Sequence, residues 1–421
     1  MKLIIKYLKT FIILVILFFS FSFISSLLPD KPIRQHIEHS IHFVDGFRDY
    51  PEPMIKGQKH SLDYAMDGMI TNMIYTIDNK EPVKSSLMGR CRMKDGKYIS
   101  QWHNLKYSIY YNTLKPNVNY ARYWHGNTFF YRYFFLFTHY NELKWIIYLM
   151  TSLLLAIFTI IIYRNTGTLK TLAILAGLFF VNIYIMQFSM QLSPVLIISL
   201  ISGILVIHQY KKQPESVFLF FFIVGGVTSY FDLLTAPLLT FGIPALIWIS
   251  IDEHNSDKPL ATALRQLVAM GALWAAGYAT LWAAKWVISA PFTEFNLFTD
   301  VQQQINLRSN AVDNSRISAI MVNFNQIPIV IINVILLGLL ITSLFHFNRK
   351  GIRQAVLYLS IAVLPFIWYF ATANHSTYHF WYTYRILAIS ISGVILAFVS
   401  IISWDEVKTG KFLRRKSRSQ S

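Results

Sequence analysis

The chain has 421 residues, of which 54% are hydrophobic and 14% are charged, and its formal net charge is +17. This composition excludes an ordinary soluble domain, in which about a quarter of the residues are charged. The positive charge would indicate nucleic-acid binding in a soluble protein, but Lys and Arg also mark the cytoplasmic loops of membrane proteins, so we expect no nucleic-acid partner. Cys91 is the single cysteine, which excludes disulfides within the chain and Cys-rich metal sites.

The first apolar run covers residues 10–28 and follows Lys2, Lys6 and Lys9. It is longer than the apolar core of a signal peptide, which has about 7–15 residues, and no A-x-A-like cleavage site follows it. We therefore predict a first membrane span rather than a cleaved leader.

The segment 29–142 separates this run from the later apolar runs, and two of its parts have helical patterns. Residues 61–75 carry apolar side chains at helical spacing, with Ser61 placed as the N-cap. Residues 120–140 combine aromatic rings with Arg and His, which suits the membrane interface. We therefore predict a large loop whose amphipathic, interfacial helices lie on the bilayer surface.

Nine further apolar runs complete the pattern. Among the short loops between them, Lys and Arg occur only on the side of the N-terminus, so we expect both termini in the cytoplasm and residues 29–142 outside. The sequence predicts an all-α polytopic membrane protein with about ten transmembrane helices, a single transmembrane domain over 1–403 and a basic cytoplasmic tail over 404–421. The nine runs cover residues 145–163, 169–187, 194–208, 217–230, 238–250, 267–288, 327–347, 355–370 and 386–402.

Two acidic residues, Asp63 and Asp67, lie four positions apart in the first predicted loop helix and so share one helix face. Like charges at this spacing destabilise an isolated helix by about 0.2–0.5 kcal/mol. A helix surface without a function would therefore have little reason to carry both carboxylates. A carboxylate over a membrane cavity is suited to act as the general base for an acceptor hydroxyl. For Asp63, in the first helical turn, interaction with the helix dipole is an equal alternative.

Two charged residues, Asp232 and Lys285, lie close to the ends of predicted spans. A carboxylate at membrane depth is costly and indicates function, so we assign Asp232 to substrate binding, with capping of the next helix ahead of Pro237 as the alternative. Lys285 lies between Trp282 and Trp286, where it either snorkels to the interface or binds a lipid phosphate.

The last outer turn, residues 374–385, combines aromatic rings with two His and one Arg. Arg385 cannot be deprotonated and needs an anion or several acceptors. Rings beside an Arg suit a saccharide face and a phosphate, although they also suit an interfacial belt. A metal site on two His alone is a weak hypothesis. We assign Arg385 to the donor phosphate and His375, His379, Trp381 and Tyr384 to the substrate.

Two other outer segments carry cations suited to a phosphate. Arg122 and His125 lie in residues 120–126, where interfacial anchoring is the alternative, and Arg308 lies in residues 291–325, where a solvated loop is the alternative. We assign Arg122 and Arg308 to the phosphate and His125 to the substrate. The outer face therefore carries the candidate chemistry.

With these residues on one face, the chain resembles the polytopic GT-C glycosyltransferases, which use a polyprenyl-phosphate sugar on the non-cytoplasmic side. The resemblance rests on architecture over most of the chain: a cytoplasmic N-terminus, a long acidic first outer loop and many following spans. It implies Asp67 or Asp63 as the catalytic base and Arg385, with Lys285 or Arg308, on the donor phosphate. The chain is also similar to a group of uncharacterised bacterial membrane proteins that share residues 62–69, 120–126, 231–237 and 375–385.

The resemblance implies an enzyme of the bacterial cytoplasmic membrane with a polyprenyl-phosphate-linked sugar as donor and a cell-envelope glycan or lipid as acceptor. The main alternative is a transporter or flippase of lipid-linked saccharide, although the sequence lacks the internal repeat that is common in transporters. The Trp-Trp-Asp-Tyr-Gly motif of oligosaccharyltransferases is missing, so protein N-glycosylation is not expected. No cofactor is indicated, and a requirement for a divalent cation is left open.

Overall fold

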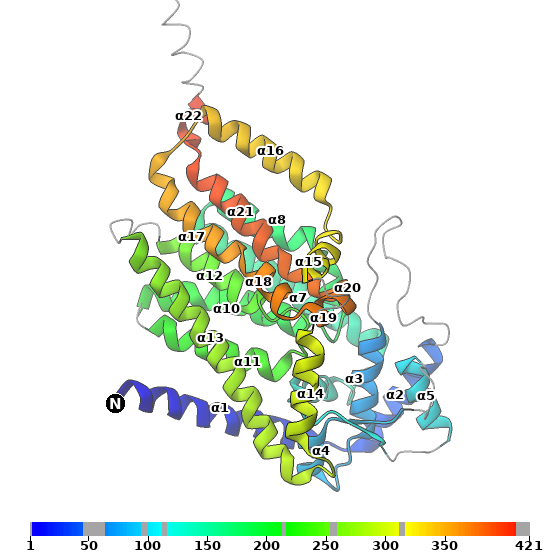
Figure 1. Cartoon of the computed structure of the whole chain (residues 1–421). Coiled ribbons are helices and arrows are strands. Elements are labelled where there is room, and N and C mark those ends of the chain that lie inside the picture. The colour runs from blue at the N-terminus through cyan, green and yellow to red at the C-terminus, as the bar shows by residue number, and fades with distance from the viewer. Residues whose placement is uncertain are drawn as a thin grey trace, which may run out of the picture.

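The computed structural model describes residues 2–44, 64–93, 100–111, 116–212, 216–252, 259–310 and 316–409. This part of the chain is almost entirely helical (Figure 1). Its one sheet is the antiparallel pair of β1 (Arg90–Cys91) and β2 (Val118–Asn119). The predicted all-α class is confirmed.

Within the described residues, six segments are long and apolar enough to cross a membrane. A seventh is counted if α15 (Arg316–Phe324) and α16 (Ile329–Phe345), which meet at 85°, form one broken span. The chain is thus built as a multi-pass membrane protein. The six segments contain α1 (Lys2–Ser26), α7 (Tyr140–Thr166), α10 (Ser193–Lys212), α13 (Leu260–Ser289) with η3 (Ala290–Phe292), η5 (Arg349–Gly351) with α17 (Ile352–Ala362) and α18 (Leu364–Ala371), and α20 (Phe380–Thr383) with η6 (Tyr384–Ile386) and α21 (Leu387–Ile401).

Three further apolar helices are shorter: α8 (Thr168–Phe180), α11 (Val217–Phe231) and α12 (Leu239–Ile251). The predicted run 169–187 is divided, because α8 is followed by a break with Asn182 at φ 58° and then by α9 (Ile183–Phe188). All the predicted apolar runs are therefore largely helical, but a count of ten spans remains a prediction. Irregular backbone at membrane depth is tolerated where protein buries it, as it does at Val181. Protein also buries every residue of α12, which contains Pro244.

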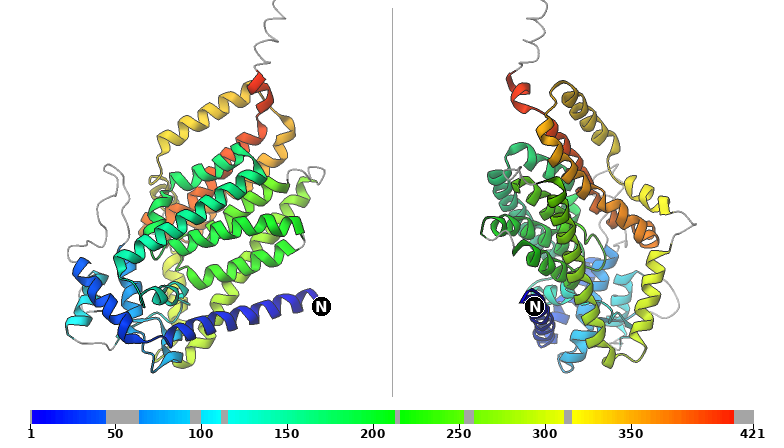
Figure 2. Two further views of the ribbon diagram at one scale, coloured as in Figure 1. Left: turned by 180° about the vertical axis from the view of Figure 1, so that it is seen from behind. Right: turned by 60° about the vertical axis from the view of Figure 1, so that its left-hand side comes forward.

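The helices α1 and α16 lie at opposite edges of the bundle (Figure 2). Large apolar side chains of both are exposed, for example Ile4 at 73% and Leu344 at 73%. Lipid is the natural solvent for such surfaces, since water would penalise them. Both helices are therefore placed to face the bilayer.

The helices α11 and α13 pack with their backbones in direct contact at two glycines. A Cβ atom at Gly225 would lie 1.9 Å from the Trp274 carbonyl oxygen, and one at Gly277 would lie 2.0 Å from the Phe222 carbonyl oxygen. Small residues allow this approach between membrane helices, where the hydrophobic effect gives little drive for association.

We expect the Gly225→Leu substitution to lower the unfolding temperature and the yield of monodisperse protein in detergent. The added side chain must displace the α13 backbone, and overpacking of this kind costs about 1–3 kcal/mol or more. Gly338→Leu on α16 is the matched control, because a Cβ there meets no atom within 4 Å. Equal unfolding temperatures for the two variants would contradict the close packing of α11 on α13.

The described part of the predicted outer loop contains five helices, which gather at one end of the bundle (Figure 1). Their core includes Ile33, Ile74 and Trp102, and it continues into the start of α7. α3 differs from the predicted interfacial helix, because protein buries nearly all of its side chains. Ser61 and Asp63 lie outside the described residues. The five helices are α2 (Asp30–Val44), α3 (Tyr64–Thr76), α4 (Pro82–Met88), α5 (Gln101–Tyr110) and α6 (Gly126–Phe134).

Arg132, on α6, connects this loop to the end of α1. Its guanidinium is fully buried and donates hydrogen bonds to the carbonyl oxygens of Ser25 at 3.0 Å, Leu28 at 3.1 Å and Ile74 at 3.0 Å. It also forms an ion pair with Asp30. One side chain therefore joins α1, α2, α3 and α6.

Candidate functional site

A tight turn between α11 and α12 holds Asp232. One carboxylate oxygen, Oδ1, accepts hydrogen bonds from the Thr235 amide at 2.9 Å and from the Thr235 hydroxyl. Leu234 has φ 64°, in the left-handed region that side-chain-bearing residues rarely adopt. The turn is therefore strained and held by its own side chains, a condition that clusters at functional sites.

The second carboxylate oxygen of Asp232, Oδ2, is buried and accepts no hydrogen bond from the described residues. Burial raises the pKa of Asp232 to about 6, although the hydroxyl and amide of Thr235 and the amides of Leu234 and Ala236 act to lower it. A buried acceptor without a partner calls for an explanation. A carboxylate with a pKa near neutrality, in a strained turn, is suited to proton transfer.

Two histidines lie next to this turn: His375 on α19 (Ala373–Tyr378) and His379 directly after it. Their ring centroids are 4.9 Å apart. His375 Nε2 donates a hydrogen bond to the Leu234 carbonyl oxygen at 2.8 Å, so this nitrogen carries the proton. His375 thus fixes the strained residue of the Asp232 turn.

Both imidazoles are neutral at pH 7. Burial lowers the pKa of His375 to about 3 and that of His379 to about 4, and the charge of Arg308 lowers both further. The Nδ1 atom of His379 is buried and has no hydrogen-bond partner among the described residues. The pair therefore offers neutral hydrogen-bonding groups rather than cations.

Arg308 supplies the positive charge of the cluster from the last turn of α14 (Leu297–Ser309). Its Nη1 donates to the backbone oxygen of Gln304 at 3.0 Å and to the Gln304 side chain at 2.7 Å, whereas its buried Nε has no partner among the described residues. The predicted residues Asp232, His375, His379 and Arg308 come from three distant parts of the sequence. The two rings and the Leu234 carbonyl oxygen connect the first three, and Arg308 lies within electrostatic range of both histidines. We call these four residues the Asp232 cluster.

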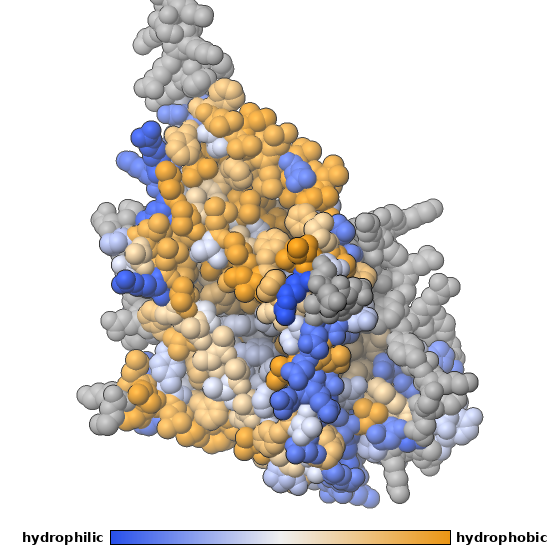
Figure 3. All heavy atoms as spheres, viewed as in Figure 1, coloured by the Kyte–Doolittle hydropathy of each residue, from blue (hydrophilic) through white to orange (hydrophobic). Residues whose placement is uncertain are grey.

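Aromatic rings line α13 beside this cluster. Trp274, Tyr278, Trp282 and Trp286 recur at every fourth position, and successive ring centroids are 5.7, 5.9 and 5.2 Å apart. Tyr278, which sequence reasoning missed, lies within electrostatic range of Asp232 and Arg308. On this side, the space-filling view shows hydrophilic atoms along α14 next to a recessed, weakly polar band (Figure 3).

The predicted phosphate ligand Arg122 is engaged with α14. Its guanidinium donates to the Asp300 carboxylate at 3.0 Å and lies 4.9 Å from the centre of the Tyr120 ring. Its backbone oxygen accepts hydrogen bonds from the indoles of Trp282 at 2.6 Å and Trp286 at 3.0 Å. Arg122 therefore fixes α14 against α13.

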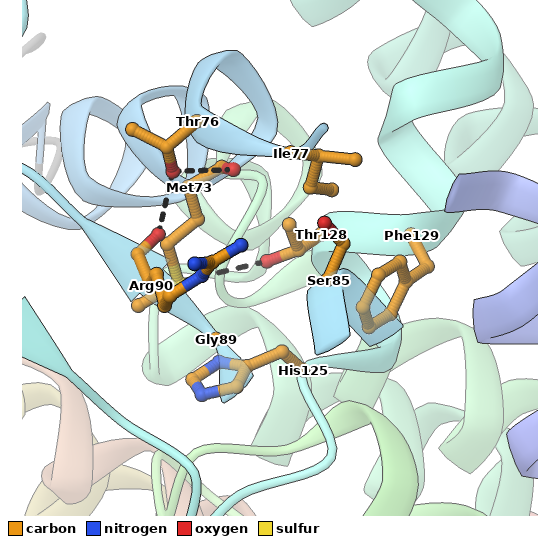
Figure 4. Close-up of a pocket in the computed structure, with 9 residues that line it drawn as sticks. All are labelled: Met73, Thr76, Ile77, Ser85, Gly89, Arg90, His125, Thr128 and Phe129. Carbon is orange, nitrogen blue, oxygen red and sulfur yellow. Dashed lines mark hydrogen bonds between the residues drawn. The ribbon is translucent and has the colours of Figure 1, made fainter. Parts of the chain in front are cut away.

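His125 is buried with φ 58°, and its Nε2 bonds to the Tyr120 carbonyl oxygen at 2.9 Å. Burial lowers the pKa of His125 to about 3. It lies with Gly89, Thr76 and Thr128 around a cavity of about 10 Å³ (Figure 4). A cavity of this size holds about one water molecule, so it does not admit a sugar.

Asp67 is buried in the core of the first-loop helices, whereas the sequence predicted a carboxylate over a membrane cavity. Its Oδ2 accepts a hydrogen bond from the Tyr140 hydroxyl at 2.8 Å, and its Oδ1 accepts one from the Met190 amide at 3.0 Å. Both oxygens are thus engaged by α7 and by the turn after α9. The role of Asp67 as a catalytic base stays a prediction.

Lys285 is fully buried, which contradicts the alternative that it snorkels to the interface. Its Nζ donates to the Leu87 carbonyl oxygen at 2.6 Å and lies 5.4 Å from the centre of the Trp124 ring. The positive charge of Lys285 there compensates the partial negative charge of the carbonyl groups at the C-terminal end of α4. Binding of a phosphate by Lys285 stays a prediction.

Arg385 and Tyr384 lie in the core near the break after α8. Arg385 Nη1 donates to the Trp381 carbonyl oxygen at 2.6 Å, and the guanidinium lies 4.9 Å from the centre of the Tyr384 ring. The Tyr384 hydroxyl donates to the Val181 carbonyl oxygen at 3.1 Å. Trp381 reaches the Asp232 cluster, since its ring centroid lies 5.2 Å from that of His379.

Among the described residues, no three His, Cys, Asp or Glu side chains are grouped so that they could hold a metal ion. Comparison with protein-family models, curated proteins and solved structures finds no match to this chain.

Proposed function

We propose that this protein is a glycosyltransferase of the bacterial cytoplasmic membrane that moves a sugar from a polyprenyl-phosphate carrier to a cell-envelope glycan or lipid. Both termini would be cytoplasmic and the reaction extracytoplasmic. The observation that supports it most is the buried, strained carboxylate of Asp232, next to neutral histidines and Arg308. The GT-C resemblance supplies the donor class.

In this proposal Asp232 Oδ2 accepts the proton of the acceptor hydroxyl. The hydroxyl oxygen of the acceptor forms the new bond to the sugar at the same time. The bond between the sugar and the carrier phosphate breaks, and the phosphate keeps the electron pair. Arg308 compensates the charge that develops on the phosphate. The aromatic edge of α13 offers apolar surface to the sugar ring and to the carrier chain.

The geometry favours Asp232 over Asp67 as the base. Both oxygens of Asp67 accept hydrogen bonds from buried protein groups, whereas Asp232 has one oxygen that no described residue engages. A base must reach the proton that it abstracts, within about 2.6–3.2 Å between heavy atoms. In this proposal the contact is made by Asp232 Oδ2, which is buried and has no hydrogen-bond partner among the described residues.

Incubation of the purified full-length protein, in detergent, with labelled polyprenyl-phosphate hexose and an envelope extract tests the function. We expect release of polyprenyl phosphate and transfer of label to a larger product, because a transferase needs no separated compartments. Intact donor in detergent, together with movement of donor across proteoliposome membranes, would instead establish a flippase.

A further inference from the structure

A second cavity, of about 440 Å³, lies beyond the end of α21, between the α7–α8 turn and α22 (Trp404–Thr409). It is at the opposite end of α21 from His379, and α22 lies away from the helices of the first loop (Figure 1). Its volume falls within the roughly 300–1,000 Å³ of small-molecule sites. The predicted topology places it on the cytoplasmic side.

Backbone pairing fixes the wall of this cavity. The Asn348 amide donates to the Ile401 carbonyl oxygen and the Ser403 amide to that of His346, both at 2.7 Å. The Trp404 indole donates to the Val399 carbonyl oxygen at 2.9 Å. The short helix α22 is therefore held in place, and the cavity belongs to the folded structure.

The lining is polar and carries more positive than negative charge. Lys170 and Lys408 are the two cations among the lining residues, and Asp405 is the one carboxylate. The Lys170 ammonium group also donates to the Ser250 carbonyl oxygen at 3.3 Å. Hydroxyl and amide groups come from Thr168, Ser403 and Asn348. This set of donors suits a phosphate group, which offers only acceptors and negative charge.

Exposed apolar side chains stand next to the lining residues in the sequence. Phe347, 52% exposed, directly precedes the lining residue Asn348, and Phe345, 53% exposed, lies three positions before it. A phospholipid would place its phosphate between the lysines and its acyl chains along such surfaces. Basic pockets between membrane helices on the cytoplasmic side bind anionic headgroups in this way.

From the cavity, its charge and its apolar borders, we infer that this is a binding site for the phosphate headgroup of an anionic phospholipid. The site lies apart from the Asp232 cluster and does not depend on the proposed transfer reaction. Occupancy would join α8, α21 and α22 and so stabilise the end of the bundle.

Equilibrium binding of short-chain phosphatidylglycerol to the full-length protein, in a neutral detergent, tests this site. We expect saturable binding that the double variant Lys170→Gln/Lys408→Gln weakens about ten- to thirtyfold, as the loss of two lysines near an anionic lipid predicts. Lys408 is exposed, so Lys408→Gln alone should cause part of the loss of lipid affinity without any effect on folding. Lys212→Gln, at the exposed end of α10, is the matched control and should bind as the unaltered chain does.

Two further ligands distinguish the sources of phosphate. Phosphatidylcholine should bind more weakly, and inorganic phosphate should not compete at millimolar concentration. If inorganic phosphate competes with the lipid in the unaltered chain but not in the double variant, the lipid assignment is overturned in favour of a free phosphate. Equal lipid binding by all variants would overturn the site, because it would show non-specific association.

Discussion

Replacement of Asp232 by Asn should abolish sugar transfer while the protein still folds and inserts. Asn keeps a carbonyl oxygen that can accept the hydrogen bonds of Thr235, but it cannot take a proton at neutral pH. General-base catalysis contributes about 10²–10⁴-fold, so transfer should fall by at least a hundredfold. Release of polyprenyl phosphate from labelled donor measures the effect.

The control for this variant is Glu294→Gln, which changes an exposed carboxylate in the turn before α14. It should transfer sugar at the unaltered rate. Asp67→Asn decides between the two candidate bases. The change replaces one of two buried acceptor oxygens by an amide group, so we expect it to lower the unfolding temperature. A folded but inactive Asp67→Asn protein, beside an active Asp232→Asn protein, would refute the assignment of Asp232.

The pH profile gives an independent measure of the same group. Only the ionised carboxylate can act as a base, and the pKa of Asp232 is raised to about 6. We expect kcat/KM to rise about tenfold per pH unit below about 6 and to level off above it. His375 and His379, with pKa values of about 3 and 4, are neutral over that range and add no step.

Replacement of Arg132 by Met should prevent accumulation of the folded protein or lower its unfolding temperature strongly. The change leaves Asp30 and the carbonyl oxygens of Ser25, Leu28 and Ile74 without their cation. Removal of one partner of a buried ion pair costs about 3–5 kcal/mol. Thermal unfolding of the purified protein in detergent measures the loss.

Arg132→Lys should recover only part of this stability, because an ammonium group cannot reproduce the planar fork of a guanidinium. Lys31→Met is the matched control, since Lys31 is an exposed cation on the same loop and is expected to be neutral for stability. An unfolding temperature for Arg132→Met equal to that of the control would show that the buried network contributes nothing.

The membrane helices could be predicted because their signal is local. A run of apolar residues specifies a helix in lipid whatever the rest of the chain does, and α7, α10, α13 and α21 appear where the runs predict them. The break after α8 and the bend between α15 and α16 depend on tertiary packing. Neither leaves a pattern in the sequence beyond isolated polar residues or Pro.

The candidate site could be predicted only in part. The cost of a carboxylate at membrane depth pointed to Asp232, and the density of His and aromatic residues pointed to residues 374–385. The left-handed Leu234 and the unengaged oxygen of Asp232 are properties of the folded turn. Arg132 resembles any interfacial arginine in the sequence, because its partners are backbone oxygens of distant segments.

The close contact of α11 with α13 has a consequence for the chemistry. Asp232 directly follows α11, and Tyr278 directly follows Gly277 on α13. The spacing of the carboxylate and the phenol is therefore set by Gly225 and Gly277, two residues that have no side chain to touch a substrate. Natural variants of this sequence that differ in rate or acceptor are expected to carry changes at these hidden positions as well as at the site itself.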